Sequence, residues 1–593
     1  MQHTIKTLLK SLFPLVFFCN GTFAQASKSP NVILIITDDQ GYGDLGFTGN
    51  PHVQTPVLDG LARESVRLNQ FYVSPVCAPT RSSLMTGRYS LRTGVRDTYN
   101  GGAIMATGEI TLAEMLKDSG YRTGIFGKWH LGDNYPFRPS DQGFDESLIH
   151  LAGGMGQPGD FTTFFQGDRS YFDPVLWHNN RQEAYDGYCT DIFTDEAIRF
   201  IEAKKEQPFF CYVSFNAPHT PLQVPDKYYE RYRDLDPSLG LVDDGRLFAE
   251  MTDKDKEDAR KVYAMVSNID DNVGKLMERL EELKIADNTV IIFMTDNGPQ
   301  QRRYNAGMRG LKGTVFRGGV RVPFFMKLPG GTQGGLDIDQ TLAHIDILPT
   351  LAEICQAKVP TDRIIDGQSF WPLVQGQTKE VFDTRPLFFY WTRKFPERYT
   401  NIALQKGDYK LVGNTGLDAE AGQFELFDLG NDEFEQKNIA KDQPEVADKL
   451  KEELDVMLLE LTASPNLRND QRAIIGSSEE NPVILNRNDA GGERGIWTQD
   501  DVFGLWKVNI LSGTYTIRFK FIKPLESEGN MVLETNGAVW QRKNSQVETD
   551  MLVWEDVHLP ASESDLIPYY MGGGNRYFPL WVSIARKDID GMP

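Results

Sequence analysis

The side chain best placed for chemistry is Cys77, which lies in a helix-forming run at residues 74–88. Pro79 suits the first turn of a helix, where its missing N–H costs nothing, and Gly87 can end that helix. We therefore expect Cys77 at a helix N-terminus, where free N–H groups and the helix dipole favour anions. Arg81, one turn further on, adds a bidentate donor for a tetrahedral oxyanion. The pattern indicates an anion site beside a thiol, although most free cysteines are small buried hydrophobic residues.

Oxygen ligands follow two continuous apolar runs, 31–37 and 289–295, which are typical of strands buried on both faces of a parallel sheet. If both strands belong to one sheet, their carboxyl ends share the edge at which ligands bind. Hard oxygen ligands favour Ca²⁺ or Mg²⁺ over zinc, and Ca²⁺ accepts irregular geometry. Paired aspartates are otherwise usually solvated turns. We expect one Ca²⁺ per chain, with Mg²⁺ less favoured, held by Asp38, Asp39, Asp296 and Asn297.

Basic and imidazole side chains follow two more expected strands. Lys128 and His130 are two residues apart, so in an extended segment they face the same way. Prolines on both sides of His219 hold it on a fixed loop. Lys312 can reach the same sheet edge if its glycine-rich loop folds over it. A lone histidine is more often structural than catalytic, but two that each follow a strand favour a functional interpretation.

Length and composition limit the protein class. The chain has 593 residues, of which 40% are hydrophobic, so we expect two or three globular domains. Residues 1–24 combine two lysines, an apolar run and small residues before a cleavage point, which predicts a signal peptide and export to the periplasm or the medium. No later stretch is apolar enough to predict a transmembrane segment. The net charge of −21 argues against a nucleic-acid partner and requires any anion site to be locally positive.

The order of elements predicts the domains. Alternating strands and helices indicate an α/β domain at 25–375, with a central, mostly parallel sheet between helices. Short strands and one helix at 376–470 predict a smaller α+β subdomain with an antiparallel sheet. Residues 471–481 are polar and broken, as in a linker. Residues 482–593 contain many short strands with glycine turns, which predicts an accessory β-sandwich.

The ordered motifs resemble those of the type I sulfatases, in the alkaline-phosphatase-like superfamily, over about residues 30–460. They are Asp38-Asp39, Cys77 to Arg81, Lys128-Trp-His130, the Ala-Pro-His219 loop, Asp296-Asn297-Gly298 and the Lys312 loop. The resemblance implies the fold of that superfamily with a small C-terminal domain. It also implies that a formylglycine-generating or sulfatase-maturing enzyme oxidises the cysteine to formylglycine. Position by position, it implies the Ca²⁺ ligands Asp38, Asp39, Cys77, Asp296 and Asn297, and the catalytic or sulfate-binding groups Arg81, Lys128, His130, His219 and Lys312.

The resemblance also implies a mechanism. A hydroxyl of the hydrated formylglycine attacks sulfur, and Arg81 favours its deprotonated form. Lys128 and Lys312 neutralise the sulfate oxygens. His219, or alternatively Lys312, protonates the leaving alcohol, and His130 then takes the proton whose removal expels sulfate. Arg317 stands where many members of the family carry Glu, which puts the local substrate contacts in doubt.

The substrate is not determined by these residues. A signal peptide, a sulfatase core and an added β domain favour a bacterial carbohydrate sulfatase that acts on a sulfated polysaccharide or oligosaccharide. The alternatives are a formylglycine-dependent phosphodiesterase or phosphonate ester hydrolase, and a secreted glycan-binding protein with an inactive hydrolase domain. Trp497, Trp540 and Trp554 are expected to pack in the core of the β domain rather than to stack on sugars. Aromatic or basic residues that could line a sugar subsite, or serve only packing and surface roles, are Trp177, His178, Arg181, Trp391 and Arg393.

Overall fold

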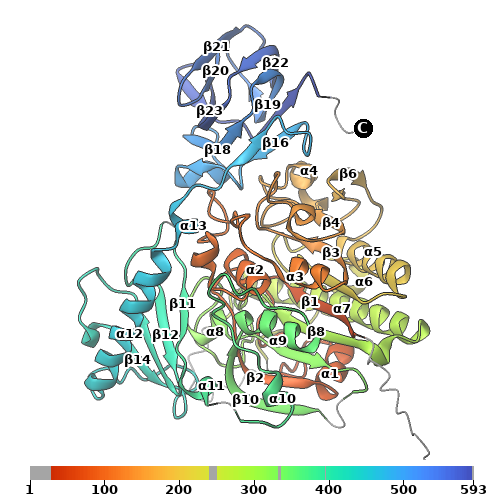
Figure 1. Cartoon of the computed structure of the whole chain (residues 1–593), viewed down its shortest axis with the longest axis vertical. Helices are drawn as coiled ribbons and strands as arrows, with labels where there is room; N and C mark the ends of the chain where they lie inside the picture. Colours follow the sequence, from red (N-terminus) through yellow and green to blue (C-terminus); the bar gives the residue numbers. More distant parts are fainter. Residues whose placement is uncertain (1–28, 240–249, 332–334, 379, 394, 590–593) are drawn as a thin grey trace, which may run out of the picture.

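The computed structural model describes residues 29–239, 250–331, 335–378, 380–393 and 395–589. The predicted signal peptide at residues 1–24 lies outside the described residues. A large α/β core carries a small subdomain on one side and a β domain at one end (Figure 1). None of the helices described has both the length and the apolar character needed to cross a bilayer.

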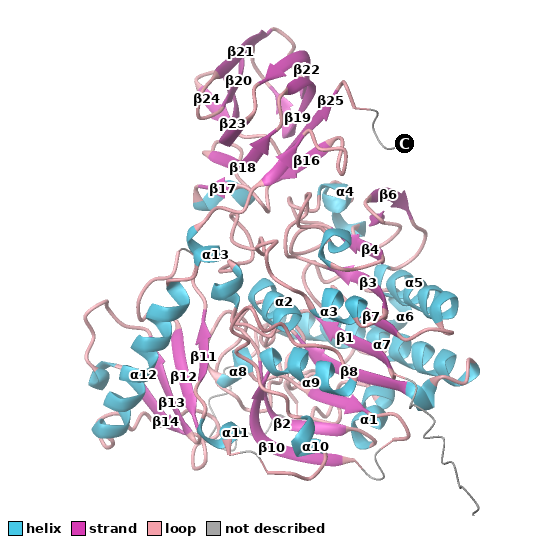
Figure 2. Ribbon diagram, viewed as in Figure 1, coloured by secondary structure: helices cyan, strands magenta, loops and turns pink. Residues whose placement is uncertain are grey.

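A ten-stranded mixed sheet forms the centre of the core (Figure 2). Its order is β10-β2-β9-β8-β1-β7-β3-β4-β5-β6. The five central strands, from β8 to β4, run parallel, and antiparallel pairs flank them through β9 and β5. The strands are β1 (Asn31–Thr37), β2 (Val66–Tyr72), β3 (Arg122–Lys128), β4 (Glu146–His150), β5 (Val175–His178), β6 (Arg181–Ala184), β7 (Phe209–Ser214), β8 (Thr289–Thr295), β9 (Phe324–Lys327) and β10 (Leu336–Ala343).

Helices cover both faces of this sheet, so the inner positions of β1 and β8 are apolar one after another, because side chains on either face are buried. In β1, Val32, Leu34 and Ile36 pack into one core, and Ile33 and Ile35 pack into the other. The first core includes α2 (Cys77–Thr86), α3 (Leu112–Asp118), α9 (Ile347–Ile354) and α10 (Trp371–Val374). The second includes α1 (Pro56–Arg63), α5 (Cys189–Lys204) and α7 (Asp253–Glu282). One-turn helices are α4 (Phe161–Phe164), α6 (Asp226–Tyr229), α8 (Arg317–Val320), α11 (Val381–Thr384) and α13 (Pro465–Arg468).

The register of the sheet brings the expected metal ligands to one edge. Thr37, the last residue of β1, is paired with Thr295, the last residue of β8. The pairs Asp38-Asp39 and Asp296-Asn297, which follow these two residues, therefore leave adjacent parallel strands at the same level. This convergence follows from strand pairing between residues more than 250 positions apart.

The small subdomain has the predicted antiparallel sheet. Its four strands are β11 (Leu387–Tyr390), β12 (Ile402–Lys406), β13 (Tyr409–Gly413) and β14 (Glu425–Asp428). Helix α12 (Pro444–Thr462) packs on this sheet through Leu450, Leu454 and Leu458. The subdomain therefore has a core of its own.

The C-terminal β domain has one sheet of seven strands and one of four around a shared core. The prediction that 471–481 is a linker is wrong in part, because β15 (Ala473–Ile475) pairs with β18 in the larger sheet. The sequence patterns also missed the long strand β23. The strands are β15, β16 (Val483–Asn486), β17 (Gly491–Gly492), β18 (Gly504–Ile510), β19 (Gly513–Leu525), β20 (Gly529–Glu534), β21 (Val539–Asn544), β22 (Thr549–Leu559), β23 (Ser562–Gly572), β24 (Asn575–Tyr577) and β25 (Trp581–Arg586).

Two adjacent aspartates on α7 have different roles: Asp270 caps another helix, whereas the exposed Asp271 side chain pairs with Arg231. Asp270 is 1% exposed and accepts hydrogen bonds from the backbone N–H groups of Val57 and Leu58, in the first turn of α1. These N–H groups have no partner within α1. Asp270 therefore joins α1 to α7 by capping one helix from the other.

We predict that Asp270→Ala lowers the free energy of unfolding by about 1–3 kcal/mol, because two buried N–H groups lose their acceptor. Urea denaturation followed by circular dichroism measures this change. Asp271→Ala is the matched control, because the Asp271 side chain is 48% exposed; it should change the free energy by less than about 0.5 kcal/mol. Equal effects of the two substitutions would contradict the capping role.

Candidate active site

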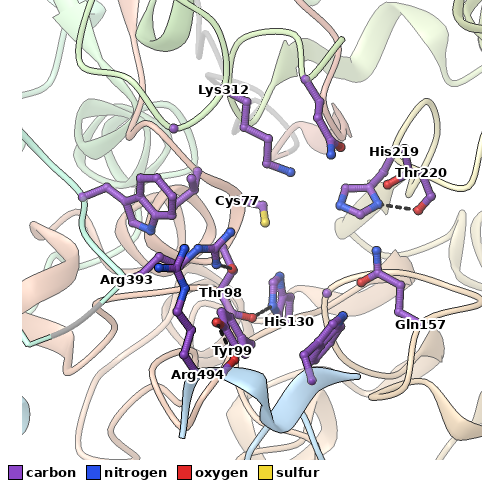
Figure 3. A pocket seen from close by; sticks show the side chains of 16 residues that line it. Cys77, Thr98, Tyr99, His130, Gln157, His219, Thr220, Lys312, Arg393 and Arg494 are labelled. Atoms are coloured by element: carbon purple, nitrogen blue, oxygen red, sulfur yellow. Dashed lines mark hydrogen bonds between the residues drawn. The ribbon is translucent and has the colours of Figure 1, made fainter. Parts of the chain in front are cut away.

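A cavity of about 460 Å³ opens at the carboxyl edge of the central sheet (Figure 3). Cys77 lies at its floor, and His130, His219 and Lys312 lie around it. Residues from the core, the small subdomain and the β domain line the cavity: Val76, Cys77, Thr98, Tyr99, His130, Gly153, Gln157, His219, Thr220, Gln300, Lys312, Gly313, Trp391, Arg393, Arg494 and Trp497.

Cys77 begins helix α2, as the sequence predicts. Val76 before it is extended, and Gly87 ends the helix in the left-handed conformation with φ 69°. The hydroxyl of Thr80 accepts a hydrogen bond from the backbone N–H of Ser74 and donates to its carbonyl, which fixes the turn into the helix. Cys77 is 2% exposed, and this burial raises the pKa of its thiol. The unmodified side chain is therefore a weak nucleophile at neutral pH.

The four expected oxygen ligands meet below Cys77. Asp38, Asp39, Asp296 and Asn297 are each 0% exposed. The side-chain amide of Asn297 donates to Oδ1 of Asp39 at 2.8 Å, and Oδ1 of Asp296 accepts from the backbone N–H of Asp39 at 3.2 Å. These contacts join the two strand ends directly.

Several buried oxygens in this group have no hydrogen-bond partner within the described ranges. They are Oδ1 of Asp38, Oδ2 of Asp39 and Oδ1 of Asn297. Ligand atoms of Asp38, Cys77 and Asp296 also lie within 4.8 Å of one another. Buried oxygens without donors are costly unless a cation compensates them. The donor set therefore fits a hard divalent cation.

Three basic side chains already balance part of this negative charge. Nζ of Lys128 lies 2.5 Å from Oδ2 of Asp38, and Nζ of Lys312 lies 2.5 Å from Oδ1 of Asp39. Burial acts to raise the pKa of the Asp38 carboxyl, but Lys128 and the other nearby cations hold it well below its usual range. Burial and the charge of Asp38 raise the pKa of Asp296 to about 7. The site is thus crowded with negative charge.

Arg81 forms hydrogen bonds with the acidic cluster. It is 1% exposed, and its Nε and Nη2 donate to Oδ2 of Asp296 at 3.2 and 2.8 Å. Its Nη1 donates to the carbonyl of Lys128 and to the hydroxyl of Ser214. Most of its donors are therefore used within the protein, and it orients Asp296 and the end of β3.

His130 lines the cavity, but its backbone conformation is not the extended one expected from the sequence. Lys128 ends β3, but His130 has φ 62°, so the two side chains do not share a face of one extended segment. Nε2 of His130 lies 2.6 Å from the carbonyl oxygen of Thr98, which can only accept, so Nε2 carries the proton. Its Nδ1 is buried and has no hydrogen-bond partner among the residues that the structure describes. Burial and the charge of Lys128 lower the pKa of His130, so Nδ1 is an unprotonated base.

The ring of His219 is also oriented by a hydrogen bond to a backbone carbonyl. Its Nδ1 lies 2.7 Å from the carbonyl oxygen of Thr220 and therefore carries the proton. Nε2 lies 3.7 Å from Oδ2 of Asp39. Burial lowers the pKa of His219, which favours the neutral ring with no proton on Nε2. In this tautomer the cavity side of His219 accepts a proton or binds a cation and cannot donate.

The sequence did not identify Arg303 and Asp44, which position Asp39. The Arg303 guanidinium forms two hydrogen bonds of 2.7 Å with the Asp44 carboxylate and donates to the Asp39 carbonyl at 2.8 Å. Both side chains are 0% exposed. Asp39 has φ 64°, a strained backbone conformation that persists only when surrounding contacts hold it. The sequence does place Arg303 shortly after the Asp296-Asn297-Gly298 motif, which could have suggested a role near the site. Its partner Asp44, however, is 259 residues away in the sequence.

The expected sugar-subsite residues divide into two groups. Trp391 and Arg393 line the cavity, whereas Trp177, His178 and Arg181 lie on β5 and β6, away from it. Trp554 and Trp540 pack on the core of the β domain, as expected. The expectation for Trp497 is wrong, because this side chain lines the cavity. Tyr99, Gln157 and Arg494 also line it and were not identified from the sequence.

We predict that Arg303→Ala lowers the free energy of unfolding by about 3–5 kcal/mol, because it leaves the buried Asp44 carboxylate without its partner. Urea denaturation measures the loss. The neighbouring Arg302 has an exposed contact with the carbonyl of Glu250, so Arg302→Ala should cost no more than about 0.5 kcal/mol. A loss below 1 kcal/mol for Arg303→Ala would show that this pair does not support the site.

Comparisons with known families agree with the motifs. The profile described as Sulfatase matches residues 30–357, more than half of the chain. A second profile, described as N-sulphoglucosamine sulphohydrolase, C-terminal, matches residues 311–462. The two matches together leave out the β domain.

Comparisons with individual proteins and with solved structures also find sulfatases or a similar fold. The chain is 31% identical to Arylsulfatase J of Mus musculus over 59% of this chain, but it spans only 56% of that protein. It is 32% identical to N-acetylgalactosamine-6-sulfatase of Mus musculus over 65% of this chain and 72% of that protein. The crystal structure of Ps i-CgsB in complex with k-i-k-neocarrahexaose superposes with a TM-score of 0.62 and 29% identity, over 74% of this chain and 94% of that one.

Proposed function

Because the chain belongs to the sulfatase family, whose enzymes hydrolyse sulfuric esters, we propose that it hydrolyses a sulfate ester on an oligosaccharide or polysaccharide, using a formylglycine derived from Cys77 and a bound Ca²⁺. One observation carries the proposal: next to Cys77, under a cavity bordered by basic side chains, lie buried oxygens that have no hydrogen-bond partner in the described part of the chain. The name of the N-acetylgalactosamine-6-sulfatase and the oligosaccharide in the Ps i-CgsB complex support a carbohydrate substrate.

In this proposal Asp38, Asp39, Asp296 and Asn297 hold the metal, and the formylglycine oxygen takes the place of the Cys77 sulfur. The metal and the formylglycine hydrate together supply positive charge for the sulfate oxygens and a nucleophilic hydroxyl. Carboxylate and amide oxygens without sulfur or histidine in the main set suit Ca²⁺, and Mg²⁺ is less favoured because it requires a regular octahedron. Formylglycine formation needs a maturing enzyme.

The basic groups bind and orient the sulfate ester. Lys312 lies on the cavity wall and Lys128 lies beneath it, and both are within hydrogen-bond distance of the acidic cluster. Ammonium groups in a buried, preorganised site stabilise the negative charge that develops on the leaving group and the sulfate oxygens. Arg81 orients Asp296 and is a positioning residue.

Two proton transfers remain to be assigned. His130 is the base, because it lines the cavity and its unprotonated Nδ1 has no hydrogen-bond partner within the described ranges. Lys312 is assigned as the proton donor to the leaving alcohol, because it lines the cavity and its ammonium group is protonated at neutral pH: burial acts to lower its pKa, but Asp39 and other nearby acids raise it. His219 is the less favoured donor, because its contact with Thr220 leaves Nε2 without a proton in the neutral ring.

We predict that the protein, produced with a maturing enzyme, hydrolyses aryl sulfate and sulfated glycans faster than an aryl phosphodiester. Mass spectrometry of the peptide that contains Cys77 should show formylglycine. Lys128→Ala should lower turnover by about 10²–10³-fold, the loss typical of one charge-stabilising donor. Lys117→Ala is the control, because the Lys117 side chain is 45% exposed and is not among the residues that line the cavity.

Preference for the phosphodiester would favour the phosphonate or phosphodiester alternative. Glycan binding with no hydrolysis and an unmodified thiol would favour the glycan-binding alternative. Near-wild-type turnover in a folded Lys128→Ala protein would contradict the role of Lys128.

We predict that Ca²⁺ stabilises the protein directly. At a hundredfold excess over its dissociation constant, the ion should add about 2.7 kcal/mol, which EDTA removes. Thermal unfolding with and without Ca²⁺ measures this, and Mg²⁺ should give a smaller shift. Asp39→Asn should reduce the shift strongly, whereas Asp337→Asn, at a surface ion pair with a 51% exposed side chain, should retain it. An equal shift in both variants would place the ion elsewhere.

A further inference from the structure

The C-terminal β domain forms part of the cavity wall. Arg494 and Trp497, the first and last residues of the 3₁₀-helix η7 (Arg494–Trp497), both line the cavity that contains Cys77. Side chains three residues apart in a 3₁₀-helix lie on the same face, so both can point the same way. Neither residue falls within the segments matched by the family profiles, which end at residue 462.

The η7 segment is held firmly within its own domain. Ile496 is 0% exposed and belongs to the domain core. Arg487, also 0% exposed, donates to the carbonyls of Ile496, Gln499, Phe578 and Pro579. Because one buried guanidinium connects four backbone carbonyls, η7 presents its outer face in a defined position.

The β domain is also fixed against the core. Oδ2 of Asp489 accepts from the backbone N–H of Asp133 at 3.0 Å, and Oδ2 of Asp133 accepts from the side chain of Asn486 at 2.8 Å. The rings of Tyr99 and Trp497 meet edge to face across the boundary, with centroids 5.5 Å apart. The cavity wall is therefore continuous between the two domains.

This part of the wall is aromatic and positively charged. The Arg393 guanidinium lies over Trp391 at 4.7 Å and over Tyr99 at 5.0 Å, and it pairs with Asp97 at 3.2 Å. The Arg494 guanidinium, also on the cavity wall, makes no ion pair or hydrogen bond with any residue that the structure describes. Figure 3 shows Arg393 and Arg494 on the same side of Cys77, opposite His219 and Gln157. This part of the cavity wall thus carries two guanidinium groups, of which Arg393 pairs with the Asp97 carboxylate, in a protein whose net charge is −21.

We propose that Arg494 and Trp497 of the β domain, together with Trp391 and Arg393, form a subsite for a sugar that carries a second anionic group besides the scissile sulfate. The inference rests on the proposed sulfatase function and names the substrate class of the same site. Aromatic faces bind the apolar face of a sugar ring, and guanidinium groups bind sulfate or carboxylate through paired N–H donors. The β domain then determines specificity, while the core performs the hydrolysis.

The test compares substrates that do and do not reach this subsite, using the full-length matured enzyme. The substrates are 4-nitrophenyl sulfate and a panel of oligosaccharides with one sulfate, two sulfates, or one sulfate and one uronic acid. We expect the wild-type enzyme to prefer an oligosaccharide with a second anion. The disulfated and uronic-acid members of the panel show whether that anion is a sulfate or a carboxylate.

Arg494→Ala should lower kcat/KM on the preferred oligosaccharide about 10- to 100-fold, mainly through KM, because one charged hydrogen bond is lost. It should change the rate on 4-nitrophenyl sulfate less than twofold, and Arg494→Lys should recover part of the loss. Trp497→Ala should weaken oligosaccharide binding in the same way. Arg518→Ala, at an exposed arginine on β19 of the same domain, is the control and should have no effect.

Binding gives a readout that does not depend on turnover. In a Cys77→Ala background, calorimetry should show weaker binding of the preferred oligosaccharide after Arg494→Ala and no change after Arg518→Ala. Unchanged KM and binding in Arg494→Ala, or a wild-type preference for oligosaccharides with one sulfate and no uronic acid, would overturn the subsite. Failure of the wild-type enzyme to hydrolyse any sulfate ester, including 4-nitrophenyl sulfate, would instead overturn the proposed function.

Discussion

The site depends on keeping three buried carboxylates together at one edge of a sheet. Asp38, Asp39 and Asp296 are all 0% exposed, and each contacts a different basic side chain. Unpaired charges in such surroundings would cost several kcal/mol each. The pairing is incomplete, because one oxygen of Asp38 and one of Asp39 accept no hydrogen bond from any residue described in the structure. The excess negative charge lowers the stability of the folded protein. It also suits the site to bind a cation and, beside that cation, an anionic substrate.

Backbone strain accompanies this charge cluster. Asp39 and His130 both have positive φ, at 64° and 62°. Such conformations cost of order 1–3 kcal/mol each in residues other than glycine and persist where surrounding contacts enforce them. For Asp39 the contact is Arg303, and for His130 it is the carbonyl of Thr98. His130 lines the cavity and Asp39 belongs to the acidic cluster, so the strained backbone positions candidate functional side chains.

Each of the three domains contributes different residues to the cavity. The core supplies Cys77, the acidic cluster and the histidines, and the matched family profiles cover all of them. The small subdomain adds Trp391 and Arg393, and the β domain adds Arg494 and Trp497. An added domain that borders the cavity can change which substrates fit without altering the reacting groups. Its firm attachment through Asp133 and Asp489 makes this contribution part of the folded enzyme.

The sequence alone determined the features that depend on local patterns. Apolar runs predicted β1 and β8 with acids at their ends, and Pro79 and Gly87 predicted the helix that starts at Cys77, because strand burial and helix capping act over a few residues. The strand β23 was missed because Ser564, Pro568 and Gly572 occupy inward positions and weaken its alternation. Only the tertiary structure decided the contacts between distant segments. Three contacts depend on how whole elements and domains pack: Arg303 pairs with Asp44, His130 is oriented by the carbonyl of Thr98, and Trp497 lines the cavity. No short-range sequence pattern encodes that packing.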